Sequence, residues 1–256
     1  WLSTSVYGTI TSAVEGAALN LGEAMTPITL NYTVNASPSS GSSSGSGGST
    51  STSSPFVYMN DKLSSSSHTC AILENGDLKC WGYDRHGQLG DGGPAWSTSN
   101  PTDVDAPSST AIDLGTGRTA VAVSTGFSHT CALLDNGEVK CWGRDQFGQL
   151  GDGGAFSPSG DTNTPSTAID FGTGRTAIAI DAGGDHACAI LDNGDLKCWG
   201  WDNEGQLGDG GSATNTNAPS STPIDLGTGR TAVAVSAGYY HVCAVLDNGE
   251  LKCWGK

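Results

Sequence analysis

The sequence is poor in positive charge. Its 256 residues include 11 Lys plus Arg against 26 Asp plus Glu, which gives a formal net charge of −15 at pH 7. Proteins that bind DNA or RNA neutralise backbone phosphates with cationic side chains, so a chain this acidic is repelled by nucleic acid. We therefore expect no nucleic acid among its partners.

Long apolar runs and helical periodicity are also missing. No stretch approaches the ~20 apolar residues of a membrane-spanning helix, so no membrane span is predicted. Glycine, by contrast, accounts for 38 residues. This composition predicts an all-β fold with many turns. The chain begins at Trp1 without a methionine or a signal peptide, and we expect a processed or partial chain.

What the sequence does contain is a repeated motif. The stretch HTCALLDNGEVKCWG at 129–143 has counterparts at 68–82, 186–200 and 241–255. The first three copies continue into Gly-Gln-Leu-Gly-Asp-Gly, as at 148–153. Self-similarity of this kind predicts a repeat architecture of small β units.

Each copy predicts a β-hairpin with a cross-strand disulfide. The turn in the first copy is 74–76, Glu-Asn-Gly, which suits a three-residue loop with glycine in the left-handed conformation. Leu73 then pairs with Asp77, and Cys70 falls opposite Cys80 at close to disulfide distance. The predicted pairs are Cys70–Cys80, Cys131–Cys141, Cys188–Cys198 and Cys243–Cys253.

Zinc binding is the alternative use of these residues. His68 and Cys70 lie two apart and face the same side of a strand, so Cys80 could join them as a third ligand. Zinc sites usually bring cysteines in C-x-x-C pairs, which favours disulfides here, and we expect no metal site. The repeated histidines are then structural. Paired cysteines in an acidic, Ser/Thr/Gly-rich chain predict an extracellular or cell-surface location.

The motif from Ala182 to Gly210 resembles the repeat of the regulator-of-chromosome-condensation family, in its secreted, disulfide-containing type. The resemblance covers roughly 56–256, and the predicted domain of propeller-type repeats is 55–256. The resemblance implies a β-propeller of four-stranded antiparallel blades, with seven blades in the best-known members. The expected strands of a blade are Ala-Val-Ala-Val, His-x-Cys-Ala-x-Leu, the Lys-Cys-Trp strand and Ala-Ile-Asp-Leu. Four repeats fall short of seven, so we expect an open array or one completed by another chain. A closed ring of four blades is the alternative.

The N-terminal part of the sequence lacks the repeated motif. Residues 1–36 form a predicted β-strand segment, with strands at 5–11 and 28–34 and a resemblance to an immunoglobulin-like surface module over 19–33. Asn31 and Asn35 head predicted N-glycosylation sequons. Residues 37–54 are nearly all Ser, Gly and Thr, the composition of a flexible linker.

Three further patterns carry hypotheses. Asp113 and Arg118, with their repeats, predict local ion pairs or a ligand-binding arginine. The acidic glycine loops, such as 84–91, are either structural bends or calcium sites. Trp81, Trp142, Trp199 and Trp254 are expected between blades. A second set of aromatic residues predicts either a contact surface for sugars or a partner, or packing in the core or between blades: Tyr83, Trp96, Phe147, Trp201, Tyr239 and Tyr240.

No catalytic constellation is evident, because the histidines recur in every repeat and the paired cysteines leave no free thiol. We expect a non-enzymatic protein without a cofactor. The favoured role is an extracellular structural protein that self-assembles head-to-tail into a filament by strand addition or blade stacking. The alternative is a surface binding module for a protein or glycan on a closed propeller. The resemblance also implies guanine-nucleotide exchange on a small GTPase, which the disulfides disfavour.

Overall fold

In the computed structural model of the chain, residues 62–93, 104, 106–154, 156, 161–165, 167–211 and 213–256 are described. The chain divides into two compact units, 1–54 and 55–256, and every described residue belongs to the second. The predictions made for segment 1–36, for linker 37–54 and for Trp96 therefore lie outside the described residues.

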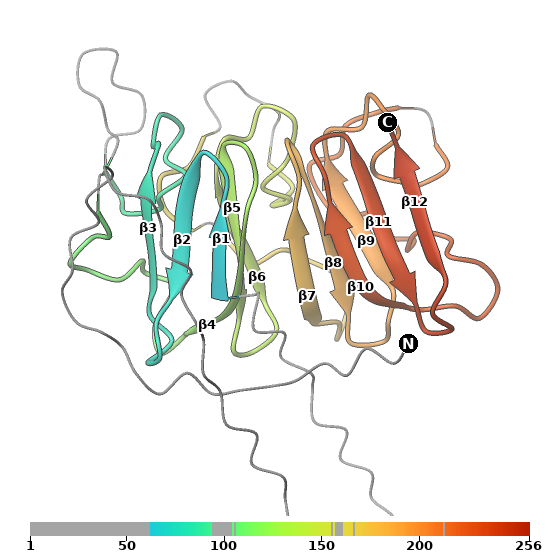
Figure 1. The fold of residues 1–256 in the computed structure, drawn as a ribbon, viewed down its shortest axis with the longest axis horizontal. Helices are drawn as coiled ribbons and strands as arrows, with labels where there is room; N and C mark the ends of the chain where they lie inside the picture. The colour runs from blue at the N-terminus through green and yellow to red at the C-terminus, as the bar shows by residue number, and fades with distance from the viewer. Residues whose placement is uncertain are drawn as a thin grey trace, which may run out of the picture. The chain divides into compact units, whose positions relative to one another are not determined.

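The described residues form four sheets, each of three antiparallel strands, and the sheets follow one another in sequence order (Figure 1). This confirms an all-β array of propeller-like blades. No helix among these residues is long and apolar enough to cross a bilayer. The strands are β1 (Leu63–Ser65), β2 (His68–Ile72) and β3 (Leu78–Gly82); β4 (Ala120–Thr125), β5 (His129–Leu134) and β6 (Val139–Gly143); β7 (Ala177–Ala182), β8 (His186–Leu191) and β9 (Leu196–Gly200); and β10 (Ala232–Ala237), β11 (His241–Leu246) and β12 (Leu251–Gly255).

The hairpin turn has the predicted geometry. The Leu73 N–H donates to the Asp77 carbonyl at 2.8 Å, and the Gly76 N–H donates to the Leu73 carbonyl at 2.9 Å. Gly76 has φ +84°, a conformation that glycine adopts without steric cost. Cys70 is consequently the direct partner of Cys80 across β2 and β3. Turn chemistry thus sets the register of the whole hairpin.

The expected fourth strand is not formed as a strand in the first three blades. Gly82 exchanges two backbone hydrogen bonds with Val104, and the Ile112 N–H donates to the Leu78 carbonyl at 2.9 Å. The step from Leu78 to Gly82 is four residues, whereas the step from Val104 to Ile112 is eight, so the intervening chain cannot stay in register. The same two contacts recur in the second and third repeats. The predicted four-stranded blade is therefore corrected to three strands plus an outer segment attached at two points.

The hydrophobic core lies between consecutive sheets. One cluster combines Cys70, Leu78 and Leu89 of the first repeat with Leu134 and Trp142 of the second. Two further clusters join the second repeat to the third and the third to the fourth. Each blade is thus stabilised by its neighbours, as in other repeat proteins.

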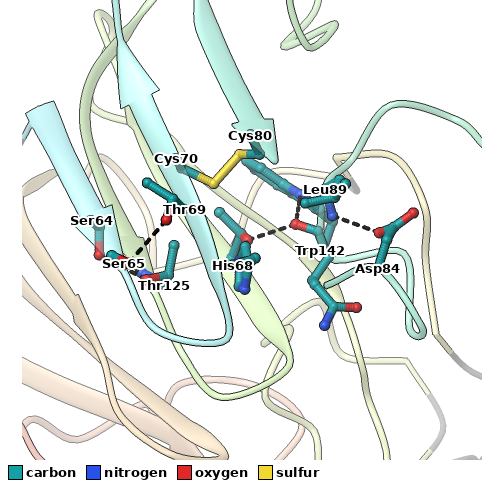
Figure 2. Close-up of a disulfide and its surroundings, with 12 residues drawn as sticks. Ser64, Ser65, His68, Thr69, Cys70, Cys80, Asp84, Leu89, Thr125 and Trp142 are labelled. Carbon is teal, nitrogen blue, oxygen red and sulfur yellow. Dashed lines mark hydrogen bonds between the residues drawn. A yellow bond between two sulfur atoms is a disulfide. The ribbon is translucent and has the colours of Figure 1, made fainter. Parts of the chain in front are cut away.

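Trp142, Trp199 and Trp254 each bond to the preceding blade, which confirms the predicted place of these three tryptophans. The Trp142 Nε1–H donates to the Gln88 carbonyl at 2.9 Å, and Trp199 donates in the same way to Gln149 at 3.1 Å. Trp254 repeats the contact with Gln206 at 2.9 Å. Figure 2 shows Trp142 reaching the loop that carries Leu89, beside the disulfide of the first hairpin.

Candidate binding surface

One end of every blade is built by a recurring backbone contact. The N–H of the residue after Trp-Gly donates to the carbonyl of the residue before the histidine, as Arg144 does to Ser128 at 2.9 Å and Trp201 to Asp185 at 2.9 Å. Two short stretches therefore meet at the same end of each sheet. We call this end the rim, and it consists of 66–67 with 83–86, 127–128 with 144–147, 184–185 with 201–204, and 239–240 with 256.

Rim positions vary between repeats, although the framework around them does not. The histidine, both cysteines and the Trp-Gly pair are identical in all four copies. The position after Trp-Gly holds Tyr83, Arg144, Trp201 and Lys256 in turn. Repeat proteins commonly place their binding residues at such variable positions on one face of a constant scaffold. The rim is therefore the candidate binding surface.

Five aromatic rings of the rim form a continuous row over the second to fourth repeats. Phe147 lies 6.0 Å from Trp201 between ring centroids, and Trp201 lies 5.0 Å from Tyr240. Tyr240 is 4.4 Å from Tyr239, which is 5.8 Å from Phe127. Phe127 and Tyr239 each expose 45% of their surface. Large aromatic rings held at the surface are typical of recognition sites.

A groove of about 680 Å³ adjoins this row between the first two repeats. It contains apolar ring surface together with cations, an anion and hydroxyl groups. Its lining residues are Ser67, Tyr83, Arg85, His86, Phe127, Ser128, Arg144, Gln146 and Asp161.

Two pairs of polar side chains lie at or beside the rim. His86 Nδ1 is 2.7 Å from Asp161 Oδ2, and Lys256 Nζ is 3.4 Å from Glu204 Oε1. Lys256 Nζ also lies 5.6 Å from the Tyr240 ring centroid. The surface thus presents hydrogen-bond donors and acceptors side by side.

Arg144 connects the groove to the aromatic row. Its Nη1 is 3.6 Å from Asp185 Oδ1, and its guanidinium carbon lies 5.3 Å from the Phe147 ring centroid. Asp185 also accepts a hydrogen bond from Gln149 Nε2 at 3.0 Å. Burial raises the pKa of Asp185, and the charge of Arg144 opposes that rise. Asp185 therefore holds Arg144 in position over the ring.

The cysteines form disulfides in all four hairpins: Cys70–Cys80, Cys131–Cys141, Cys188–Cys198 and Cys243–Cys253. With their sulfur atoms bonded to each other, they are not the thiolates that the zinc alternative requires. His68 Nε2 is instead hydrogen-bonded to Thr130 Oγ1. No group of three or more His, Cys, Asp or Glu side chains is arranged for a metal in the part of the chain that the structure describes.

The acidic glycine loops use their first aspartate to form the bend. Asp84 Oδ1 accepts the Leu89 N–H at 2.9 Å, and Asp145 and Asp202 make the same contact with Leu150 and Leu207. Their carboxyl groups lie inside the loops, which favours the structural interpretation over a calcium site.

The predicted ion pairs within the Gly-Thr-Gly turns were wrong. Asp113 Oδ1 accepts the Gly115 N–H at 2.9 Å, and Arg118 Nη1 lies 3.4 Å from Asp135 Oδ2 in the hairpin turn. The two later repeats show the same arginine contact, Arg175 with Asp192 and Arg230 with Asp247. The aspartate is used by its own turn, so the arginine reaches the neighbouring hairpin.

Most of the predicted aromatic contact residues do come together. Phe147, Trp201, Tyr239 and Tyr240 belong to the row, and Tyr83 lines the groove. Sequence reasoning missed Phe127 and the two groove arginines, Arg85 and Arg144. Their signal was available, because all three occupy positions that differ from repeat to repeat.

Comparison with known proteins gives a consistent result. The sequence pattern described as "Regulator of chromosome condensation (RCC1) repeat" matches residues 64–88, 120–149, 177–206 and 232–256. A second pattern of that description matches 136–190.

Among similar proteins, the human "E3 ubiquitin-protein ligase HERC2" is 30% identical over 77% of this chain, which spans 4% of that protein. The "Ultraviolet-B receptor UVR8" of Arabidopsis thaliana is 28% identical over 75% of this chain, which spans 40% of it. The chain therefore spans less than half the length of these relatives. Yeast RCC1 (Prp20), solved bound to Kap60, has a TM-score of 0.62 at 21% identity, covering 77% of this chain and 44% of its own. That likeness concerns the fold alone.

Proposed function

Because the chain belongs to the regulator of chromosome condensation (RCC1) repeat family, which includes regulators and binding proteins, we propose that it is a non-catalytic extracellular binding module. The rim holds its ligand. The observation that carries this proposal is the row of five aromatic rings, built from positions at which the repeats differ.

The arrangement of the rim supports binding rather than catalysis. Its polar groups are spread over four repeats and paired with one another, whereas an active site gathers unlike groups around one reacting atom. Exposed rings next to a groove supply apolar contact area, and the paired charges supply directional hydrogen bonds.

The disulfides support an extracellular location. Glutathione and thioredoxin keep thiols reduced in the cytosol, and four hairpin disulfides are expected to persist only in an oxidising compartment.

A capture experiment tests the role of the rim. Immobilised protein is exposed to the extracellular fraction of its own organism, in parallel with the variant Trp201→Ser/Tyr240→Ser and the control Ile178→Ala. Ile178 is exposed at the end of β7 remote from the rim. We expect the same ligand on the wild type and the control and its loss from the rim variant. Equal capture by all three proteins refutes the proposal.

Head-to-tail assembly is a second candidate, favoured by the outer edge of β12. Leu251 is 65% exposed, whereas the equivalent Leu78, Val139 and Leu196 are fully buried under outer segments. An extended segment from another copy, added along β12, would bury Leu251 in the same way. Electron microscopy without reducing agent is expected to show regular filaments that Leu251→Lys abolishes. Monodisperse single particles in the wild type contradict this candidate.

A further inference from the structure

We propose that the rim binds an uncharged, hydroxyl-rich carbohydrate chain. This inference rests on the proposed binding function and names the chemistry of its ligand. Two properties of the rim lead to it, the aromatic row and the pairing of its polar groups, and the charges of the rim argue against a polyanion.

The aromatic row supplies adjacent ring surfaces that begin and end in the second repeat and reach the fourth. Four successive centroid separations, from 4.4 to 6.0 Å, connect Phe147 to Phe127 across three repeats. The apolar C–H faces of sugar rings pack against aromatic rings, which combine a large apolar surface with little conformational freedom. Several sugar rings of one carbohydrate chain can contact these residues together.

The polar groups of the rim match hydroxyl groups. Each hydroxyl offers one donor and two acceptor sites, so it can bond to an arginine or lysine and to a carboxylate at once. The pairs Arg144–Asp185 and Lys256–Glu204 present such a donor beside such an acceptor. His86 and Asp161 provide a third pair inside the groove. A neutral ligand can use these pairs without separating them.

The charges of the rim argue against a polyanionic ligand. The rim contains more carboxylates than cations: Asp84, Asp145, Asp185, Asp202 and Glu204 against Arg85, Arg144 and Lys256. Two of the cations, Arg144 and Lys256, are paired with Asp185 and Glu204. A polyanion would be repelled by the protein and would find these cations already paired. A cationic partner would find Asp185 and Glu204 already paired with Arg144 and Lys256.

Binding to defined oligosaccharides tests the inference. Hexasaccharides of β-1,4-linked glucose, N-acetylglucosamine, xylose and mannose serve as neutral probes in titration calorimetry, with α-1,4-galacturonate as the anionic probe and oligolysine as the cationic one. We expect at least one neutral probe to bind, with less than a twofold change between ~0.05 and ~0.5 M salt. Trp201→Ala should weaken binding by about tenfold, because a stacking contact is lost, while Ile178→Ala leaves it unchanged.

Treatment of the captured material separates this inference from the function on which it rests. Rim-dependent material that periodate destroys and protease spares supports a carbohydrate ligand. Rim-dependent material that protease destroys and periodate spares overturns the inference but leaves the binding function intact. Binding of galacturonate or oligolysine in place of the neutral probes also overturns it. Equal capture by the wild type and the rim variant refutes the proposed function itself.

Discussion

Position 151 requires glycine for two reasons, its backbone conformation and the closeness of a tryptophan side chain. Its φ is +67°, and a Cβ at this position would lie 2.5 Å from Trp199 Nε1. Gly174 has a similar φ of +72° but nothing within 4 Å of its Cβ position. Gly151→Ala should therefore cost the backbone strain of about 1–2 kcal/mol plus about 1–3 kcal/mol for overpacking the tryptophan. Gly174→Ala should cost the strain alone.

Urea denaturation of both variants measures the difference between the two glycines. A larger loss of unfolding free energy in Gly151→Ala, accompanied by a shift in tryptophan fluorescence, is the expected result. Equal losses would mean that the Trp199 contact adds nothing to stability.

His129 is buried, and its protonation makes the stability of the fold depend on pH. Burial, together with the neighbouring His186 and His68, lowers the pKa of His129 to about 3 from 6.5. The unfolded chain binds a proton first, so stability is complete above about pH 6.5 and is lost as the pH falls toward 3. His129→Gln should remove about 2 kcal/mol of the stability difference between pH 7 and pH 5.

Unfolding free energies of wild type and His129→Gln at the two pH values measure this effect. Asp145 acts in the opposite direction, because burial raises its pKa to about 6 and its neutral form favours the folded state. It is present in both proteins and cancels in the comparison. Parallel pH profiles for the two proteins would contradict a neutral buried His129.

In each hairpin, the disulfide and the turn together hold the two strands in register. Cys131 and Cys141 are buried between β5 and β6 in a central sheet, and the bond joins residues ten apart. A cross-link of this length restricts the unfolded chain by roughly 3 kcal/mol. We expect Cys131→Ala/Cys141→Ala to lower the unfolding free energy by that amount, measured by denaturant titration. A much smaller loss would assign the stability to the turn and the core.

The outer segments show where element prediction stops. The spacing of Cys70, Asn75 and Cys80 was sufficient to predict β2, β3 and their register, because the three-residue turn places Cys70 opposite Cys80 and a two-residue turn would miss by one. The described residues of 104–112 pair with the backbone of β3 at Val104 and Ile112, eight residues apart. Length mismatch with β3, rather than propensity, decides this, and it is evident only when the two are placed side by side.

In the molecule as a whole, each blade packs against the next. The amides of a blade that is covered on both faces should therefore be better protected from hydrogen exchange than those of a terminal blade. All residues of β5 and β8 are buried, whereas most of β12 is exposed. We expect amides of β5 and β8 to exchange hydrogen at least about tenfold more slowly than those of β12. Hydrogen exchange measured by NMR tests this expectation. Uniform protection would indicate that β12 is covered in solution, as assembly along its edge predicts.

The sequence by itself determined the hairpins, their turns, the place of the interblade tryptophans and the family resemblance. These features depend on residues close together in the chain or repeated at a fixed period, so pattern suffices to predict them. Tertiary structure alone decided that Arg118 pairs with Asp135, that the outer segment is not a strand, and that Phe127 meets Tyr239 in one row. Such contacts join residues far apart in sequence, and their distances are set by how the sheets pack against each other.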